Sequence, residues 1–441
     1  MKIVLLALAL SATMVIAADH LVVTAEEFNV AVAKAQPGDT ITLRAGEWKD
    51  VDLLVTANGT AEQPITVRAE HPVETIVTGE SRLRFAGDHL IVSGLFFKGA
   101  WHKEDLIVFR RDSKTLANDC RLTDCAVVDC NSPENNETRW IGIYGQRNRV
   151  DHCWIQGKTS KGTTLVIWLN ENPTDHRIDH NYFGPRPELK QNGGETIRVG
   201  DSKTSMQLCR TIVEANCFEQ CDGEAEIISN KSCGNIYRGN TFRRCSGTLT
   251  LRHGNDCIVE GNFFFGEKAR GSGGVRIIGE RHRVIGNYFQ DLAGDRARAG
   301  LCLVNGLKDS PLNGYFQVRG AEITGNTWVN CKQTVFIGQT DEDTDNSLPT
   351  QGVVISRNLI AGKTAAVTIG LAGDVTWKDN IVHPAVQPEP AIPGLNAVDF
   401  VLEGQPLQLP PVGSTAVGYG FALPDGAQGP LLPTETGPDW R

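Results

Sequence analysis

The sequence is poor in several features that would point to common protein classes. Its 441 residues include only 3 Met and 6 Tyr, and its 12 Cys form no Cys-x-x-Cys pair, so a zinc cluster is not expected. Basic residues are not in excess, because 43 Lys and Arg face 52 Asp and Glu for a net charge of −9. This balance argues against general nucleic-acid binding, which favours a basic surface. Long helical patterns are absent, and no apolar run is long enough to span a bilayer.

The composition still provides for a large folded core. Hydrophobic residues make up 40% of the chain and charged residues 22%, which excludes a disordered protein. Several Cys recur at a spacing of 24 residues, as in Cys209, Cys233 and Cys257. Such regularity predicts small buried side chains in equivalent positions of a repeating unit.

The N-terminus has the pattern of a bacterial-type secretory signal peptide. Lys2 precedes an apolar run from Ile3 to Ala18 that ends in small residues. We therefore predict a signal peptide over residues 1–17 and export to the periplasm or the medium.

A short repeat determines the predicted fold. An apolar residue, two mostly polar residues, Asn, a variable residue and an apolar one recur at intervals between 22 and 39 residues. The repeated Asn are Asn181, Asn216, Asn240, Asn262, Asn287, Asn326, Asn358 and Asn380, and Cys125 and Cys153 stand at the same place in earlier copies. Short alternating segments such as 248–252 lie between the copies, as strands do. Coils of near-constant length with variable loops predict an all-β, single-domain parallel β-helix, a solenoid.

The ends of the solenoid need caps. Thr24 and Glu27 form a capping-box pattern ahead of Phe28 and Val32, which predicts an N-terminal capping helix. Residues 18–383 are assigned to the β-helix. Residues 384–441 contain 11 of the 20 Pro and are predicted to pack along it as an extended tail.

Basic residues recur at nearly the same phase of neighbouring repeats. Lys231 precedes its repeat Asn by 9 residues, Arg252 by 10 and Arg276 by 11. Equal phase predicts one column of basic side chains on one face. Strand alternation should turn Ala225 and Ile227 inward, and Glu224 and Glu226 outward.

Two adjacent carboxylates repel each other unless a cation lies between them. Hard oxygen ligands suit Ca²⁺, and Asn192 of the preceding coil can add a carbonyl oxygen. The alternative is a solvated Glu pair facing Lys and Arg neighbours. For His253, a structural hydrogen bond and a functional role are both open.

A cation beside Lys and Arg suits elimination from a uronic acid. A divalent cation neutralises the uronate carboxylate, which makes the C5 proton easier to remove. A lysine among other cations can accept that proton, while Arg or His assists departure of the O4 leaving group.

These motifs resemble polysaccharide lyase family 6, which contains alginate lyases and chondroitinase B. The matching segments are 192–198, 224–232, 252–254 and 274–276. The resemblance implies a right-handed parallel β-helix, with Ca²⁺ bound by Asn192, Glu224 and Glu226. It also implies Lys231 as Brønsted base and Arg252 as Brønsted acid. It implies substrate contacts for the following residues: Glu195, Arg198, His253 and Arg276.

The predicted function is cleavage of alginate, an anionic polymer of mannuronate and guluronate. One alternative is a dermatan sulfate lyase, for which Lys268, Arg270, Arg281 and Arg283 are candidate sulfate contacts. Another is a noncatalytic carbohydrate-binding β-helix. Some family members dimerise through a second β-helix domain, for which this chain is too short, so a monomer is expected. Insertions between Asn287 and Asn358 are expected to close the cleft, with Tyr315, Phe316 and Phe336 as candidate aromatic contacts.

Overall fold

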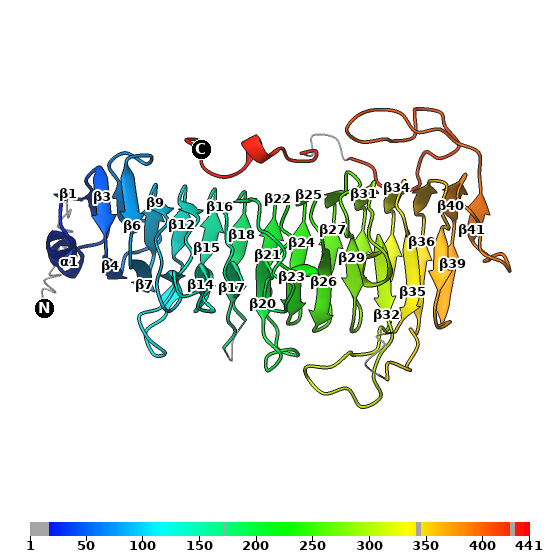
Figure 1. Ribbon diagram of the computed structural model, residues 1–441, viewed down its shortest axis with the longest axis horizontal. Coiled ribbons are helices and arrows are strands. Elements are labelled where there is room, and N and C mark those ends of the chain that lie inside the picture. Colours follow the sequence, from blue (N-terminus) through cyan, green and yellow to red (C-terminus); the bar gives the residue numbers. More distant parts are fainter. Residues whose placement is uncertain (1–16, 171–172, 341–344, 424–427) are drawn as a thin grey trace, which may run out of the picture.

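The computed structural model describes residues 17–170, 173–340, 345–423 and 428–441. All but the last residue of the predicted signal peptide lie outside this part of the chain. The described chain winds into a parallel β-helix whose coils follow one another along the long axis of the molecule (Figure 1). The predicted fold class is therefore confirmed. None of the described helices has the length and apolarity needed to cross a membrane.

Three long sheets of parallel strands form the walls of the β-helix. Sheet 1 contains β1 (Asp19–Val22), β2 (Thr40–Leu43), β5 (Ile65–Ala69), β8 (Leu90–Ser93), β12 (Arg121–Thr123), β15 (Arg149–Asp151), β18 (Arg177–Asp179), β21 (Ile212–Glu214), β24 (Ile236–Arg238), β27 (Ile258–Glu260), β30 (Arg283–Ile285), β33 (Glu322–Thr324), β36 (Val353–Ser356) and β39 (Val375–Lys378). Sheet 2 contains β4 (Asp52–Thr56), β7 (Arg82–Asp88), β10 (Ile107–Val108), β11 (Ala117–Asn118), β14 (Ile141–Ile143), β17 (Leu165–Ile167), β20 (Ile197–Gly200), β23 (Glu226–Lys231), β26 (Thr248–His253), β29 (Val275–Ile277), β32 (Leu301–Val304), β35 (Val335–Gln339) and β38 (Val367–Ile369). Sheet 3 contains β3 (Gly46–Lys49), β6 (Thr75–Thr78), β9 (Phe96–Lys98), β13 (Ala126–Val128), β16 (Trp154–Gln156), β19 (Tyr182–Phe183), β22 (Cys217–Glu219), β25 (Thr241–Arg243), β28 (Phe263–Phe265), β31 (Tyr288–Gln290), β34 (Thr327–Val329), β37 (Leu359–Ala361), β40 (Asn380–His383) and β41 (Leu395–Ala397).

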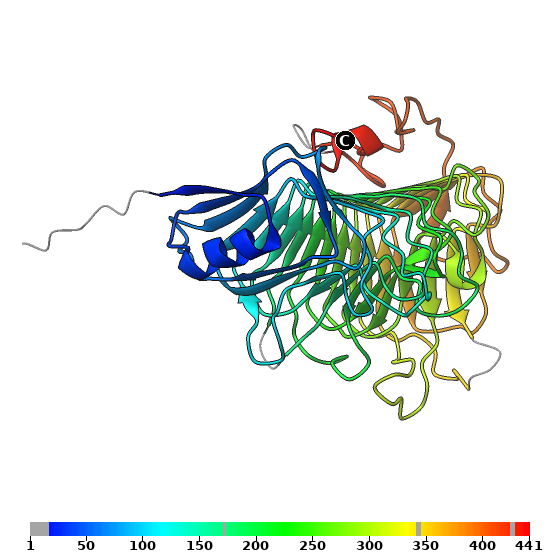
Figure 2. The same cartoon turned by 60° about the vertical axis from the view of Figure 1, so that its left-hand side comes forward.

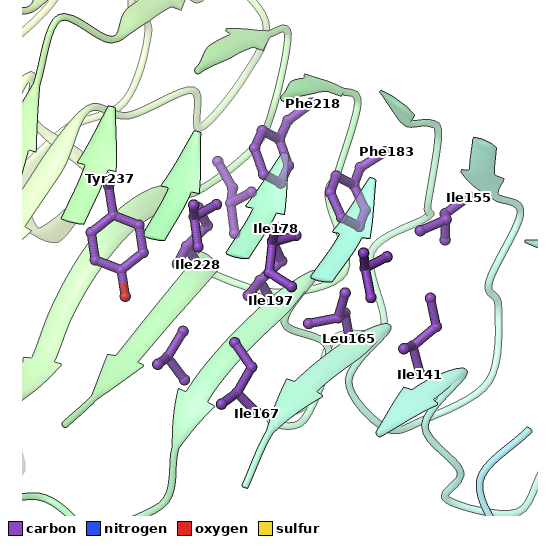
Figure 3. Close-up of a cluster of buried hydrophobic side chains, with 14 of the residues drawn as sticks. Ile141, Ile155, Leu165, Ile167, Ile178, Phe183, Ile197, Phe218, Ile228 and Tyr237 are labelled. Atoms are coloured by element: carbon purple, nitrogen blue, oxygen red, sulfur yellow. The ribbon is translucent and has the colours of Figure 1, made fainter. Parts of the chain in front are cut away.

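Equivalent side chains of successive coils stack inside the three walls. Phe183, Phe218, Phe242, Phe264 and Phe289 form a continuous stack with ring centroids 4.5–4.9 Å apart. Figure 3 shows the start of this stack beside the aliphatic side chains that sheets 1 and 2 turn inward. The core thus grows by one layer with each coil, as expected of a solenoid.

The repeated Asn form a buried ladder at the bend between sheets 1 and 3. The Oδ1 atom of Asn240 accepts the backbone N–H of Asn216 at 3.1 Å, and the same bond recurs from Asn181 through Asn380. The left-handed backbone conformation expected at this bend belongs to the preceding residue, such as Ala215 or Gly239. The Asn itself supplies the hydrogen bonds that satisfy the buried backbone.

A second ladder precedes the strands of sheet 1, and histidine occupies two of its positions. The Nδ1 atom of His176 accepts the backbone N–H of Asn148 at 3.0 Å, and that of His282 accepts the N–H of Cys257 at 3.2 Å. The Oδ1 atom of Asn235 does the same for Thr211. A ring nitrogen that accepts a hydrogen bond cannot also carry a proton, so both rings are held neutral.

These two histidines predict a loss of stability in mild acid. Burial lowers the pKa of His176 to about 3 and that of His282 to about 4, against 6.5 for the free side chain. Between those values and 6.5 only the unfolded chain binds the protons, so stability is complete above pH 6.5 and falls as the pH drops. The two rings together cost about 2.5 kcal/mol between pH 7 and pH 5.5.

Urea unfolding at the two pH values measures this loss. The matched control is the double variant His176→Asn with His282→Asn, which keeps a ladder acceptor but does not titrate. It should lose about 2.5 kcal/mol less than the wild type over the same interval. Equal losses in the two proteins would contradict the assignment.

The N-terminal end of the β-helix is capped by the predicted helix, and its C-terminal end has one strand more than predicted. Helix α1 (Ala25–Lys34) closes the N-terminal end (Figure 2). Its Phe28 side chain is buried in the core. Thr24 Oγ1 accepts the N–H of Glu27, but the Glu27 carboxylate returns to the N–H of Val23 rather than of Thr24. At the other end β41 pairs with β40, so the β-helix extends to residue 397 rather than to the predicted 383.

The remaining tail runs back over sheet 3 (Figure 1). It includes the 3₁₀ helix η2 (Pro433–Glu435). Trp440 packs against Phe96, and the guanidinium of Arg441 lies 3.5 Å from the ring centroid of Tyr182. The tail therefore packs along the β-helix, as its composition indicates.

The cysteines behave as core residues. All 12 are free thiols, and 11 are buried while Cys233 is partly exposed. Nine of them belong to the main core. Cys217 and Cys302 are instead buried in smaller clusters, with Leu431 of the tail and beside Tyr315 of the insertion, respectively.

Candidate active site

A cleft of about 730 Å³ lies over the outer face of sheet 2. Six of the nine predicted site residues line it: Asn192, Glu224, Glu226, Lys231, Arg252 and His253. The sequence interpretation missed seven others: Glu188, Lys190, Gln191, Ser202, Ala225, Arg298 and Asn313. The cleft joins residues of several coils with a loop that is distant in sequence.

The predicted column of basic residues is not straight. Lys231 at the end of β23 lies opposite His253 of β26, not opposite Arg252. A register shift between Asn230 and Lys231 places Arg252 on the irregular part of β26. Arg276 is paired with Thr250, two residues earlier along the strand. The prediction of equal phase was therefore wrong in detail, because a bulge adds a residue to one strand only.

A second register shift, between Glu226 and Ile228, affects the acidic pair. Ile227 is buried in the core as predicted, but Ala225 lines the cleft instead of pointing inward. Glu224, Ala225 and Glu226 thus all face the cleft.

Lys231 lies beside a buried carboxylate. Its Nζ atom is 3.9 Å from Oε1 of Glu195, whose side chain is only 2% exposed. The other oxygen of Glu195 accepts a hydrogen bond from Thr163 Oγ1 at 3.1 Å. Glu195 therefore lies beneath the cleft and orients Lys231 by charge.

Arg252 is held by an insertion between β32 and β33. Its Nη1 donates to the carbonyl of Gly314 at 2.7 Å, and its guanidinium lies 4.2 Å from the ring centroid of Tyr315. Asn313 of the same insertion lines the cleft. The insertion between β32 and β33 thus borders the cleft, and its expected closing of the cleft stays a prediction. Tyr315 is the aromatic candidate that contacts the site.

Glu226 connects the basic residues. Its Oε1 lies 3.2 Å from Nη2 of Arg276 and 3.9 Å from Nε of Arg252, while Oε2 accepts a hydrogen bond from Ser229. Arg276 is therefore a neighbour of the acidic pair rather than a lining residue.

Glu224 has the environment of a cation ligand. Burial and the charges of Glu195 and Glu226 raise its pKa to about 7. Its Oε2 accepts N–H groups of Gly193 and Gly194 at 2.8 and 3.4 Å, and no ion pair within 4.0 Å joins it to a described basic residue. No group of three or more His, Cys, Asp and Glu side chains arranged to hold a metal occurs in the described residues. Two carboxylates and the Asn192 amide nevertheless give the oxygen donors that Ca²⁺ prefers, so these residues fit the ion.

His253 is neutral at physiological pH. Burial, followed by the charges of Arg252, Lys231 and Arg276, lowers its pKa to about 3. Its Nδ1 is buried without a hydrogen-bond partner in the described structure. Neutral His253 can therefore donate or accept a hydrogen bond with a ligand, but it does not act as an acid in the form of a charged imidazolium.

Arg198 lies apart from the cleft lining. Its guanidinium is 5.1 Å from the ring centroid of Trp168, one coil earlier on sheet 2. It belongs to the same outer face and extends the site toward the N-terminal coils.

Two of the four candidate sulfate contacts are engaged elsewhere. Arg283 is on β30 of sheet 1 and pairs with Glu322 at 3.1 Å. Arg281 precedes that strand and pairs with Asp256 and Glu280. Neither residue lines the cleft.

Comparison with known proteins identifies a family and several solved structures to which this chain is similar. The chondroitinase B family model matches residues 22–389. The structure is similar to that of the PL6 family alginate lyase AlyGC, with 39% identity, a TM-score of 0.91 and coverage of 96% of this chain and 59% of that one. It is also similar to a mannuronic acid specific polysaccharide family 6 lyase from human gut microbiota, with 32% identity, a TM-score of 0.79 and coverage of 87% and 91%.

A third similar structure is the PL6 family polysaccharide lyase Pedsa3628 from Pseudopedobacter saltans. It has 26% identity, a TM-score of 0.79 and coverage of 96% of this chain and 99% of that one. No curated protein is significantly similar to this chain. The chain spans 59% of the length of AlyGC, the longer of these relatives.

Proposed function

The chain belongs to polysaccharide lyase family 6, the family of chondroitinase B, and on this premise we propose that it cleaves alginate by β-elimination. The observation that carries the proposal is the single cleft that gathers Lys231, Arg252, His253 and the acidic pair. A noncatalytic binding module would need neither this basic pair nor the buried carboxylate beneath it.

Lys231 is the proposed base. In its neutral form Nζ takes the C5 proton of the uronate at the new chain end, and Glu195 then stabilises the resulting ammonium from 3.9 Å. The electron pair of the C5–H bond forms the C4–C5 double bond, and the C4–O4 bond breaks. The product is a 4,5-unsaturated sugar.

Arg252 is proposed to assist the leaving group. Its guanidinium is fixed by Gly314 and Tyr315, so it can donate a hydrogen bond to O4 as negative charge develops there. The proton that O4 finally receives comes from Arg252 directly or through water. Neutral His253, which lines the cleft, is proposed to bind and orient the sugar. Arg276 acts through its contact with Glu226.

The proposed metal ion is Ca²⁺, held by Asn192, Glu224 and Glu226. When bound, it would neutralise the uronate carboxylate and so stabilise the charge that develops as C5 loses its proton. The raised pKa of Glu224 supports this assignment, because a cation relieves the repulsion among three neighbouring carboxylates.

Alginate is preferred to dermatan sulfate as the substrate. Alginate carries carboxylates but no sulfate, and two of the four candidate sulfate contacts form ion pairs outside the cleft. The similar structures of a PL6 family alginate lyase and of a mannuronic acid specific family 6 lyase support the same choice.

Ultraviolet absorbance of the unsaturated product tests the substrate. The purified mature protein is incubated with Ca²⁺ and either alginate or dermatan sulfate. Absorbance should rise with alginate. A rise with dermatan sulfate alone would make dermatan sulfate, and not alginate, the substrate. If the protein is folded and absorbance rises with neither polymer, the result would favour a noncatalytic carbohydrate-binding β-helix.

Export and a monomeric state complete the proposal. The signal-peptide pattern of residues 1–17 supports export to the periplasm or the medium. Mass measurement of the N-terminus after expression in a bacterium and light scattering of the purified protein check the two points.

A further inference from the structure

A second cleft lies on sheet 2, several coils before the candidate active site. It measures about 560 Å³ and is bordered by residues on or next to β7, β10, β14 and β17. We call it the distal cleft and define it by six of its lining residues: Arg82, Arg84, Arg110, Arg139, Tyr144 and Trp168. None of these residues takes part in the chemistry proposed above.

A row of cations and aromatic rings connects the distal cleft with the active site. The guanidinium of Arg110 lies 3.8 Å from the ring centroid of Tyr144, which stacks on Trp168 at 6.0 Å with an angle of 16° between the rings. Arg198 of β20 lies over Trp168 at 5.1 Å. Because β20 pairs directly with β23, the row ends next to the strand that carries Lys231.

The distal cleft and Lys231 share one track along the sheet. Tyr144 and Trp168 directly follow Ile143 and Ile167, which are paired in register. On the next strand, the residue after the partner of Ile167 is Gly200, and Gly200 is paired with Lys231. Neighbouring strands are spaced by about 4.8 Å, so β14 lies about 14 Å before β23. A sugar chain laid along this track would reach the distal cleft several units from the bond that is cleaved.

The distal cleft is electrostatically suited to an anionic chain. Six cationic and four acidic side chains line it, which leaves an excess of two positive charges. The carboxylates of Glu104 and Asp112 are paired with Arg82 and Arg111 at 2.9 Å. Arg110, in contrast, forms no ion pair with a described carboxylate and covers Tyr144 instead.

Three residues that line the distal cleft also carry buried hydrogen-bond donors. The indole N–H of Trp168 and the Nε atoms of Arg82 and Arg139 are buried and have no acceptor in the described structure. A buried donor without a partner costs free energy, so a ligand rich in oxygen would supply the acceptors that these donors lack. Uronate sugars provide carboxylate and hydroxyl oxygens together with apolar ring faces that pack on aromatic side chains.

We propose that the distal cleft binds uronate units of the same polysaccharide chain, remote from the bond that is cleaved at Lys231. This inference rests on the proposed function, since it assigns the cleft to that substrate. Long chains would occupy both clefts, whereas a trisaccharide would occupy only the active site. The enzyme should therefore favour long chains, and this preference should depend on the distal cleft.

The variants Arg110→Gln and Arg139→Gln test the proposal. With polymeric alginate, each should lower kcat/KM about ten-fold, mainly through KM, because remote binding energy is lost. With a uronate trisaccharide each should keep kcat/KM within about two-fold of the wild type. The matched control is Arg44→Ala, which removes an exposed arginine from the turn after β2 and should leave both values unchanged. Thermal unfolding checks that each variant is folded.

Equal losses on polymer and trisaccharide, or no loss on either, would overturn the proposal. A wild type that cleaves no uronate polymer would refute the proposed function instead. In that case electrophoresis through gels containing alginate still tests the distal cleft. Binding to the polymer slows migration, so alginate should retard Arg110→Gln less than the wild type. Equal retardation would show that the distal cleft does not bind the polymer.

Discussion

Replacement of Lys231 by Ala should reduce turnover of alginate by at least about a thousand-fold, because proton abstraction by a positioned base contributes factors of this order. The side chain ends β23 at the cleft and lies outside the hydrophobic core, so the variant should fold normally. Initial rates from the absorbance of the unsaturated product measure the loss. Circular dichroism and thermal unfolding measure the fold.

Lys378→Ala is the matched control for this variant. Lys378 is an exposed lysine at the end of β39 on sheet 1, so its removal changes the net charge equally but leaves the cleft intact. The control should keep wild-type activity. Near-normal activity of Lys231→Ala, or its failure to fold, would refute Lys231 as the base.

Removal of Ca²⁺ should abolish activity, and Glu224→Gln should remove the response to the ion. Glutamine keeps the size of the side chain but loses the charge that the buried acidic group offers to a cation. A bound ion stabilises the folded state by about 2.7 kcal/mol at a concentration one hundred times its dissociation constant. The wild type should therefore unfold at a higher temperature with Ca²⁺ than with chelator, and Glu224→Gln should not.

Glu260→Gln provides the comparison for the metal experiment. Glu260 ends β27 on sheet 1, and its loss should leave both the thermal shift and the activity unchanged. Measuring the shift on the Lys231→Ala background separates ion binding from catalysis. A shift that persists in Glu224→Gln would place the ion elsewhere, and full activity in chelator would exclude a need for it.

The fold was predictable because Asn recurs at the bend between sheets 1 and 3. From Asn181 to Asn380, each repeat Asn accepts the backbone N–H of the preceding one, and this shared bond favours Asn at the same place of successive coils. Periodicity therefore revealed the coils. The tail boundary was misplaced because β41 pairs through its backbone, which leaves little trace in the composition.

The candidate site was predictable in its residues and less so in its geometry. Lys231 and Arg252 could be identified from charge at similar phase, and Glu224 from strand alternation, but the bulge in β26 displaces Arg252 from the expected column. Such bulges depend on local backbone packing. Contacts such as Arg252 with Tyr315 join residues far apart in sequence, so spacing alone could not reveal them.

The central claim is that the enzyme cleaves the polysaccharide by elimination rather than by hydrolysis. The composition of the product tests this claim most directly. Alginate is cleaved in water enriched in heavy oxygen, and the oligosaccharides are weighed by mass spectrometry. Elimination predicts unsaturated products that lack one water and carry no heavy oxygen at the cleaved bond. Saturated products, with one heavy oxygen gained per cleaved bond by the fragment that carries the new reducing end, would contradict the account.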